Sequence, residues 1–124
     1  SRKAEENITL PKVLLEDELI AKLQKIKLEK TYLNMEVKYF QSELIDILKK
    51  YFTHRYKISF FEMTTKEVLL HLKKEKTPSD LYSNMDTIFN LSDMVKFAKA
   101  QPNDDIFDKV IVDAIDFIRQ TRKD

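Results

Sequence analysis

The sequence predicts an all-α fold, a compact bundle of about five helices, and three observations support this prediction. Apolar residues recur at intervals of three and four along most of the chain, which is the period of an amphipathic helix. The chain contains no glycine, although tight β-hairpin turns usually need one. Its 124 residues, 43% of them apolar, are enough to bury a core without disulfides. We therefore expect a single helical domain over residues 13–124, preceded by a flexible tail over residues 1–12.

Composition also narrows the possible functions. The absence of cysteine excludes disulfides and thiolate chemistry, and the absence of glycine argues against phosphate-binding loops. Lys and Arg number 22 against 21 for Asp and Glu, so any binding to nucleic acid or anionic lipid must be local rather than driven by net charge. No run reaches the roughly 18 apolar residues that a spanning helix needs, so we expect a soluble fragment.

Two helices are expected in the first half of the chain. The first runs from about Val13 to Thr31, with acidic residues near its start and lysines near its end, an order that suits the helix dipole. The second, from Val37 to Tyr56, carries the longest apolar stripe, and Ile45 and Phe52 widen it. The stripe consists of Val37, Phe40, Leu44, Ile47, Leu48 and Tyr51. This helix is therefore predicted to lie centrally and to contact neighbours on more than one side.

A short connector and a third helix follow. The apolar residues of the connector, residues 57–61, are expected to close one end of the core; they are Ile58, Phe60 and Phe61. Thr64 and Glu67 form a capping-box pattern that predicts a helix from Thr65 to Lys74, with Met63 packing on Val68 as a hydrophobic staple.

Two further helices complete the predicted bundle. Thr77 is expected to cap the fourth, with Pro78 at its first position, and Ser92 and Asp93 offer a second cap that would divide it. The segment AQPNDD, residues 100–105, ends this helix and starts the last, which runs to about Thr121 with one strongly apolar face.

Candidate catalytic and metal-binding residues are few. Asp104, Asp105 and Asp108 match the DDxxD pattern with which prenyl-diphosphate enzymes hold magnesium, but such a site needs more converging oxygens. The favoured interpretation is that these carboxylates stabilise the positive end of the last helix. His54 and His71 lack metal-ligand spacing and are expected at the surface and at a boundary, respectively. We therefore expect no catalytic residue, no metal, no cofactor and no enzymatic activity.

The end of the central helix mixes basic and aromatic residues, as nucleic-acid binders often do. The basic residues are Lys49, Lys50, Arg55 and Lys57, interleaved with Tyr51, Phe52 and Tyr56. Helical spacing favours another explanation, in which the aromatics face the core and the cations occupy the helix end that prefers positive charge. A small nucleic-acid-binding domain using residues 49–57 remains the alternative function.

Four phrases, taken in order, resemble a known family. They are EDELIAKLQKIKLEK, VKYFQSELIDILKKYF, EMTTKEVLLHL and DMVKFAKAQP, followed by the long amphipathic last helix. Their order and spacing resemble the cytoplasmic C-terminal domain of membrane-anchored proteins in Bacteroidetes, related to the BatD-type proteins of the aerotolerance operon. The resemblance covers about Leu14 to Thr121. The chain departs from the family where Asn34-Met35-Glu36 replaces a turn glycine and where Phe40-Gln41 replaces an aromatic pair.

The resemblance implies a helical domain that follows a membrane span, on the cytoplasmic side of the inner membrane, with no established enzymatic activity. It also suggests a partner-binding site at the end of the fourth helix: Asp93, Lys96, Phe97, Lys99, Gln101 and Pro102. The favoured alternative is structural: Met94 and Phe97 belong to the core, the lysines are solvated and Pro102 stops the helix.

These observations together predict a non-catalytic interaction or structural module of a membrane-anchored bacterial protein. We expect a protein partner of unknown identity and no nucleic acid. Contact with the membrane is expected only through an upstream span.

Overall fold

The computed structural model describes residues 13–33, 36–98 and 102–123 of the chain. Within these ranges it contains five α-helices, one short 3-10 helix and no strand, so the predicted all-α bundle is confirmed. The elements in chain order are α2 (Leu15–Glu29), η1 (Thr31–Leu33), α3 (Val37–Tyr56), α4 (Thr65–Lys74), α5 (Ser79–Ala98) and α6 (Asp104–Thr121). The tail predicted over residues 1–12 lies outside the described residues, as does the turn at Asn34 and Met35.

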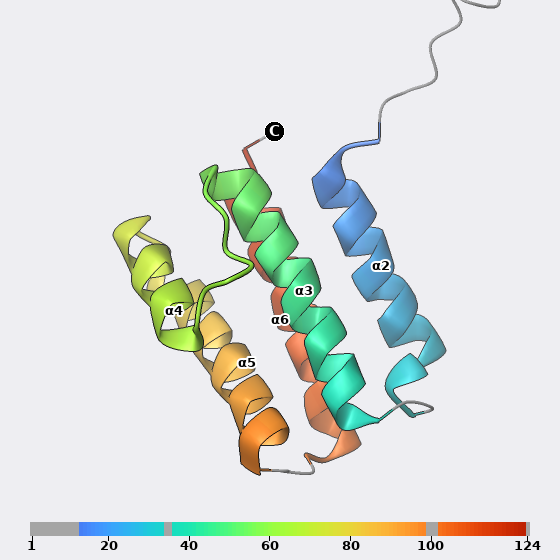
Figure 1. Ribbon diagram of the computed structural model, residues 1–124. Coiled ribbons are helices and arrows are strands. Elements are labelled where there is room, and N and C mark those ends of the chain that lie inside the picture. The colour runs from blue at the N-terminus through green and yellow to red at the C-terminus, as the bar shows by residue number, and fades with distance from the viewer. Residues whose placement is uncertain (1–12, 34–35, 99–101, 124) are drawn as a thin grey trace, which may run out of the picture.

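Helix α3 has neighbours on more than one side, as its apolar stripe predicts. It contacts α2, α5 and α6, while α2 packs mainly on α6 and α4 packs on α5. Figure 1 shows α6 behind α3, with α2 on one side and α4 and α5 on the other. The start of α2 and the ends of α3, α4 and α6 all lie at one end of the bundle (Figure 1). None of the described helices combines the length and the apolar run that a passage through a membrane requires.

The stripe on α3 forms the middle of the hydrophobic core. Five of its six predicted residues are buried, namely Phe40, Leu44, Ile47, Leu48 and Tyr51, and Val37 is half-buried. Phe52 is also fully buried, and its ring lies near five other aromatic rings, one of which is that of its neighbour Tyr51. The other four rings are those of Tyr56 of α3, Phe60 of the connector, Phe89 of α5 and Phe117 of α6. We call Phe52 and these four residues the aromatic cluster.

The helix ends show how a chain without glycine makes its turns. Lys30, Lys57 and Lys76 have positive φ angles of 49°, 65° and 58°, a left-handed conformation that usually favours glycine. Lys30 ends α2 and Lys57 ends α3. Because Lys30 turns the chain in this way, α2 stops at Glu29 and is shorter than the helix predicted to reach Thr31.

The capping prediction is confirmed for α4 and wrong for α5. Thr64 Oγ1 accepts from the amide of Glu67 at 3.2 Å, and Glu67 Oε1 accepts from the amide of Thr64 at 3.1 Å, so the capping box is complete. Thr77 does not cap α5, because its hydroxyl donates to the carbonyl of Leu72 at 2.7 Å and closes the end of α4 instead. The amide of Tyr82 donates to the carbonyl of Pro78 at 2.8 Å, so the helical pattern begins there.

Two other local predictions are also wrong. Of the connector residues expected in the core, only Phe60 is buried, whereas Ile58 is 42% exposed and Phe61 is 49% exposed. The left-handed turn at Lys57 and the hydrogen bond from the Phe60 amide to Thr53 Oγ1, at 3.0 Å, direct one aromatic inward. In α5, the division expected at Ser92 and Asp93 is absent, because the helix is continuous from Ser79 to Ala98. Core packing on both sides of these residues overrides their weak capping preference.

One buried polar side chain has no partner among the described residues. Gln41 is 1% exposed, and neither its amide nitrogen nor its amide oxygen makes a hydrogen bond. A buried amide without hydrogen bonds costs free energy, because it has given up its bonds to water.

We predict that Gln41→Met raises the free energy of unfolding by about 1–2 kcal/mol, because an apolar side chain of similar length replaces the unpaired amide. Urea unfolding followed by circular dichroism measures the change. The control is Gln24→Met at an exposed position of α2, which should change stability by less than about 0.5 kcal/mol. A loss of stability in Gln41→Met would contradict this account, since it would mean that the amide is hydrogen-bonded.

Candidate functional site

A surface groove of about 400 Å³ lies between α3, the start of α4 and α5. We call it the α3–α5 groove. Its charged lining residues are Asp46, Lys49, Glu62, Asp93 and Lys96. Its apolar lining residues are Ile45, Met63, Phe89 and Phe97. An apolar floor bordered by charges of both signs is suited to binding another molecule with mixed chemistry.

Hydrogen bonds fix the wall of the groove that the connector forms. Nζ of Lys49 donates to the carbonyl of Met63 at 2.9 Å and to that of Phe61 at 3.5 Å, which ties α3 to the connector. The capping box then starts α4 at the rim of the groove. Hydrogen bonds from the backbone amide and the hydroxyl of Thr64 lower the pKa of Glu67, so its carboxylate stays charged and keeps the cap formed.

Three of the six residues suggested as a partner site come together here. Asp93, Lys96 and Phe97 line the groove from α5. Pro102 lies half-buried between α5 and α6, outside the groove lining. Lys99 and Gln101 lie outside the described residues.

The favoured structural explanation of this segment is wrong in one respect. Phe97 is 74% exposed and Met94 is 56% exposed, so neither belongs to the core. The reason is helical register, since α5 buries Leu81, Met85 and Ile88 and continues without a break. At about 100° per residue, the positions of Met94 and Phe97 fall on the opposite side of such a helix. Two large apolar side chains, three residues apart, therefore face solvent at the end of α5.

The basic residues of the nucleic-acid alternative do not form one surface. Lys49 is held by the connector carbonyls, whereas Lys50 lines a different groove, between α2 and α3. Nε of Arg55 donates to the carbonyl of Thr121 at 2.7 Å. Lys57 is exposed in the left-handed turn after α3. Phosphate binding would need these cations on a common face, so no observation here favours that alternative, which stays a prediction.

The acidic cluster lies where the helix-dipole interpretation places it. Asp104 and Asp105 are exposed in the first turn of α6. In the described part of the chain, no three His, Asp, Glu or Cys side chains come close enough together to hold a metal ion. His71 is half-buried at the expected boundary, with its ring edge against Phe60.

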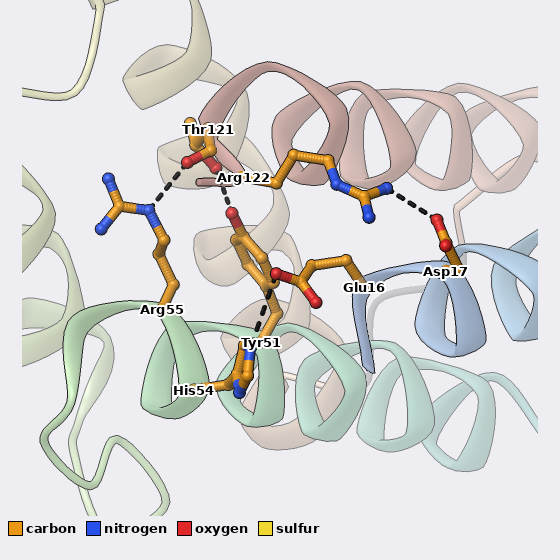
Figure 2. Close-up of polar contacts among 7 residues, drawn as sticks. All are labelled: Glu16, Asp17, Tyr51, His54, Arg55, Thr121 and Arg122. Carbon is orange, nitrogen blue, oxygen red and sulfur yellow. Dashed lines mark hydrogen bonds and ion pairs between the residues drawn. The ribbon is translucent and has the colours of Figure 1, made fainter. Parts of the chain in front are cut away.

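A polar cluster at the end of the bundle was not predicted from the sequence. Figure 2 shows side chains from α2, α3 and α6 converging there. Oε2 of Glu16, which is buried, lies 3.4 Å from Nε2 of His54, and an Arg122 guanidinium nitrogen lies 2.8 Å from Oδ1 of Asp17. The hydroxyls of Tyr51 and Thr121 are 2.6 Å apart. These contacts join the start of α2 to the ends of α3 and α6.

Burial alters the acidity of the tyrosines in this cluster. It raises the pKa of Tyr51 from 10.0 to about 12, although the hydrogen bond with Thr121 opposes the shift. Burial also raises the pKa of Tyr56, against the lowering effect of the Arg55 cation. Both phenols therefore stay protonated at neutral pH and act as neutral hydrogen-bonding groups.

Comparisons with known proteins add no family to this description. A scan against protein-family models matched none, and searches of curated proteins and of solved structures gave no significant match. A functional proposal therefore rests on the geometry of the surface and on the sequence resemblance.

Stability should fall more steeply between pH 10 and pH 12 in the wild type than in Tyr51→Phe. Because the folded pKa of Tyr51 is about 12 against 10.0 for an ordinary tyrosine, the unfolded chain loses its proton first. The stabilisation is complete below pH 10 and is lost as the pH rises through 12, a difference of about 2 kcal/mol. Urea unfolding across this range measures it.

Tyr51→Phe provides its own control in that experiment. All other titrating groups, including Tyr56 and the lysines, are common to both proteins, so only the difference between the two curves is informative. Parallel curves would mean that Tyr51 titrates normally in the folded state and is not shielded from water.

Proposed function

We propose that this chain is a non-catalytic interaction module that binds a partner protein through the end of α5 and the adjoining α3–α5 groove. The observation that carries the proposal is the 74% exposure of Phe97. Phe and Met are enriched at the cores of protein interfaces and contribute large apolar areas there. The partner would present an apolar side chain to Phe97 and Met94.

The surroundings of Phe97 support binding. Nζ of Lys96 lies 5.1 Å from the centre of the Phe97 ring, so a cation covers the edge of the apolar surface without burying it. Asp93 lies one turn earlier on the same helix and lines the groove. An apolar centre with charges at its rim is the usual arrangement of a protein interface.

The lining of the groove favours binding over catalysis. Asp46 and Glu62 are exposed carboxylates, Asp93 is half-buried, and Lys49 donates hydrogen bonds to backbone carbonyls. A catalytic acid or base is usually partly buried beside groups that perturb its pKa. The side chains of this groove are instead arranged like those of a recognition surface.

The proposal extends to the location of the module. The sequence resemblance, covering about Leu14 to Thr121, supports the cytoplasmic domain of a membrane-anchored bacterial protein, with its anchor upstream. This part of the proposal rests on the resemblance alone and is independent of the Phe97 surface.

Site-specific photo-crosslinking in the native host tests the interaction. A photoreactive residue replacing Phe97 should give a discrete adduct with one other protein, because this position would lie at the centre of the interface. The matched control replaces Leu28 of α2, which is 86% exposed and also apolar. It should give no discrete adduct. Both replacements should leave the unfolding midpoint unchanged, since neither side chain contributes to the core.

The possible adducts distinguish the outcomes. An adduct at position 97 with twice the mass of the chain would identify a second copy as the partner. Equal labelling at positions 97 and 28, or none at either position, would contradict the proposal.

A further inference from the structure

One end of the bundle differs in surface composition from the groove described above. At this end α2 begins and α3, α4 and α6 end (Figure 1). It combines exposed apolar residues with exposed lysines. We call this surface the terminal face and define it by Val13, Leu14, Lys57, Ile58, Lys76 and Lys123. It differs from the α3–α5 groove, which none of these residues lines.

Contacts beneath the terminal face hold its parts in a fixed arrangement. Asp17 of α2 binds Arg122 after α6 at 2.8 Å, and Glu16 lies beside His54 of α3 (Figure 2). The ring of Phe60 in the connector lies 5.9 Å from that of Tyr56, at the end of α3, and 5.8 Å from that of His71, near the end of α4, measured between ring centres. The start of α2 and the ends of α3, α4 and α6 are thereby held together, which fixes the backbone positions that carry the lysines of the face.

Charge is distributed unevenly between the two ends of the bundle. Among the described residues of the terminal end, exposed cations outnumber exposed anions, and one of those anions, Asp17, is already paired with Arg122. The exposed cations are Lys57, Lys73, Lys74, Lys76, Arg119 and Lys123, and the exposed anions are Asp17, Glu18, Glu75 and Asp80. The opposite end carries exposed charges of both signs, with Lys30, Lys38 and Lys96 beside Glu29, Glu36, Asp104 and Asp105. A chain with a net charge of only +1 thus presents a positive end.

Helix dipoles explain only part of this arrangement. Lysines favour the C-terminal ends of helices, and three helices end here. The dipole does not explain the apolar side chains beside them: Val13 is 68% exposed, Leu14 is 40% exposed and Ile58 is 42% exposed. Exposed apolar residues rimmed by cations are typical of surfaces that bind anionic membranes.

We infer that the terminal face binds the surface of an anionic lipid bilayer. Lys57, Lys76 and Lys123 would contact lipid phosphates, while Leu14 and Ile58 would enter the boundary between headgroups and acyl chains. This inference rests on the terminal face itself and goes beyond the proposed function. It implies that the end of α5, at the other end of the bundle (Figure 1), points away from the bilayer and stays accessible to a partner.

Vesicle co-sedimentation tests the inference with the chain itself. We expect binding to equimolar phosphatidylcholine and phosphatidylglycerol vesicles, little binding to pure phosphatidylcholine, and weakening as salt is added. The charge-reversed variant Lys57→Glu/Lys76→Glu/Lys123→Glu should bind at least tenfold more weakly, because each lysine near an anionic surface contributes roughly fivefold.

Two further variants make the test specific. The control Lys25→Glu/Lys30→Glu/Lys38→Glu changes the net charge equally, but its positions lie on α2, in the turn after α2 and at the start of α3, away from the face. It should retain most of the binding. Leu14→Ser/Ile58→Ser keeps every charge and should still bind more weakly. Circular dichroism establishes that each variant is folded.

Three results would overturn the inference. They are equal binding to neutral and anionic vesicles, equal weakening by the two charge-reversed variants, and a preference for a random DNA duplex over the vesicles. Crosslinking at position 97 does not depend on these lysines, so failure of the lipid test leaves the partner proposal standing, and the reverse also holds.

Discussion

The packing around Phe52 is the interaction on which the rest of the structure depends. Its ring lies 5.3 Å from that of Phe60, 6.0 Å from that of Phe89 and 5.4 Å from that of Phe117, measured between ring centres. One side chain of α3 thereby joins the connector, α5 and α6. Aromatic rings bury large areas and gain further from edge and offset contacts, so this cluster contributes strongly to the stability of the bundle.

The core fixes the two surfaces at which we place function. The connector places Phe60 against Phe52. The same path of the chain brings the carbonyl of Met63 to Nζ of Lys49, and this contact forms one wall of the α3–α5 groove. At the end of the bundle, the Tyr51 ring belongs to the core, and its hydroxyl joins the polar cluster through the hydrogen bond with Thr121. The groove and the terminal face are thus both positioned by the packing of the core. Each can bind another molecule without a rearrangement of the core.

Sequence patterns predicted the parts of the fold that depend on local rules. The bounds of α3 and α4 agree with the predictions because helical spacing and the Thr64–Glu67 box act within a few residues. The exposure of Phe97 was not predicted, because a break expected at Ser92 would have changed which side of the helix Phe97 occupies. In the unbroken α5, the ring lies on the side that faces solvent. The Asp17–Arg122 and Glu16–His54 contacts join residues far apart in the sequence. In the sequence, these contacts are indicated only by a charged residue near a helix end that has no opposite charge nearby. Such a residue does not identify the side chain that will pair with it.

A pair of phenylalanine substitutions tests the central role of Phe52 most directly. In equilibrium unfolding, Phe52→Ala should lower the free energy of unfolding by about 3–5 kcal/mol, the cost of emptying a well-packed aromatic position. Phe61→Ala removes the same group from a side chain that is 49% exposed, and should cost less than about 1 kcal/mol. Similar losses in the two variants would contradict the account, because they would mean that the aromatic cluster does not hold the bundle together.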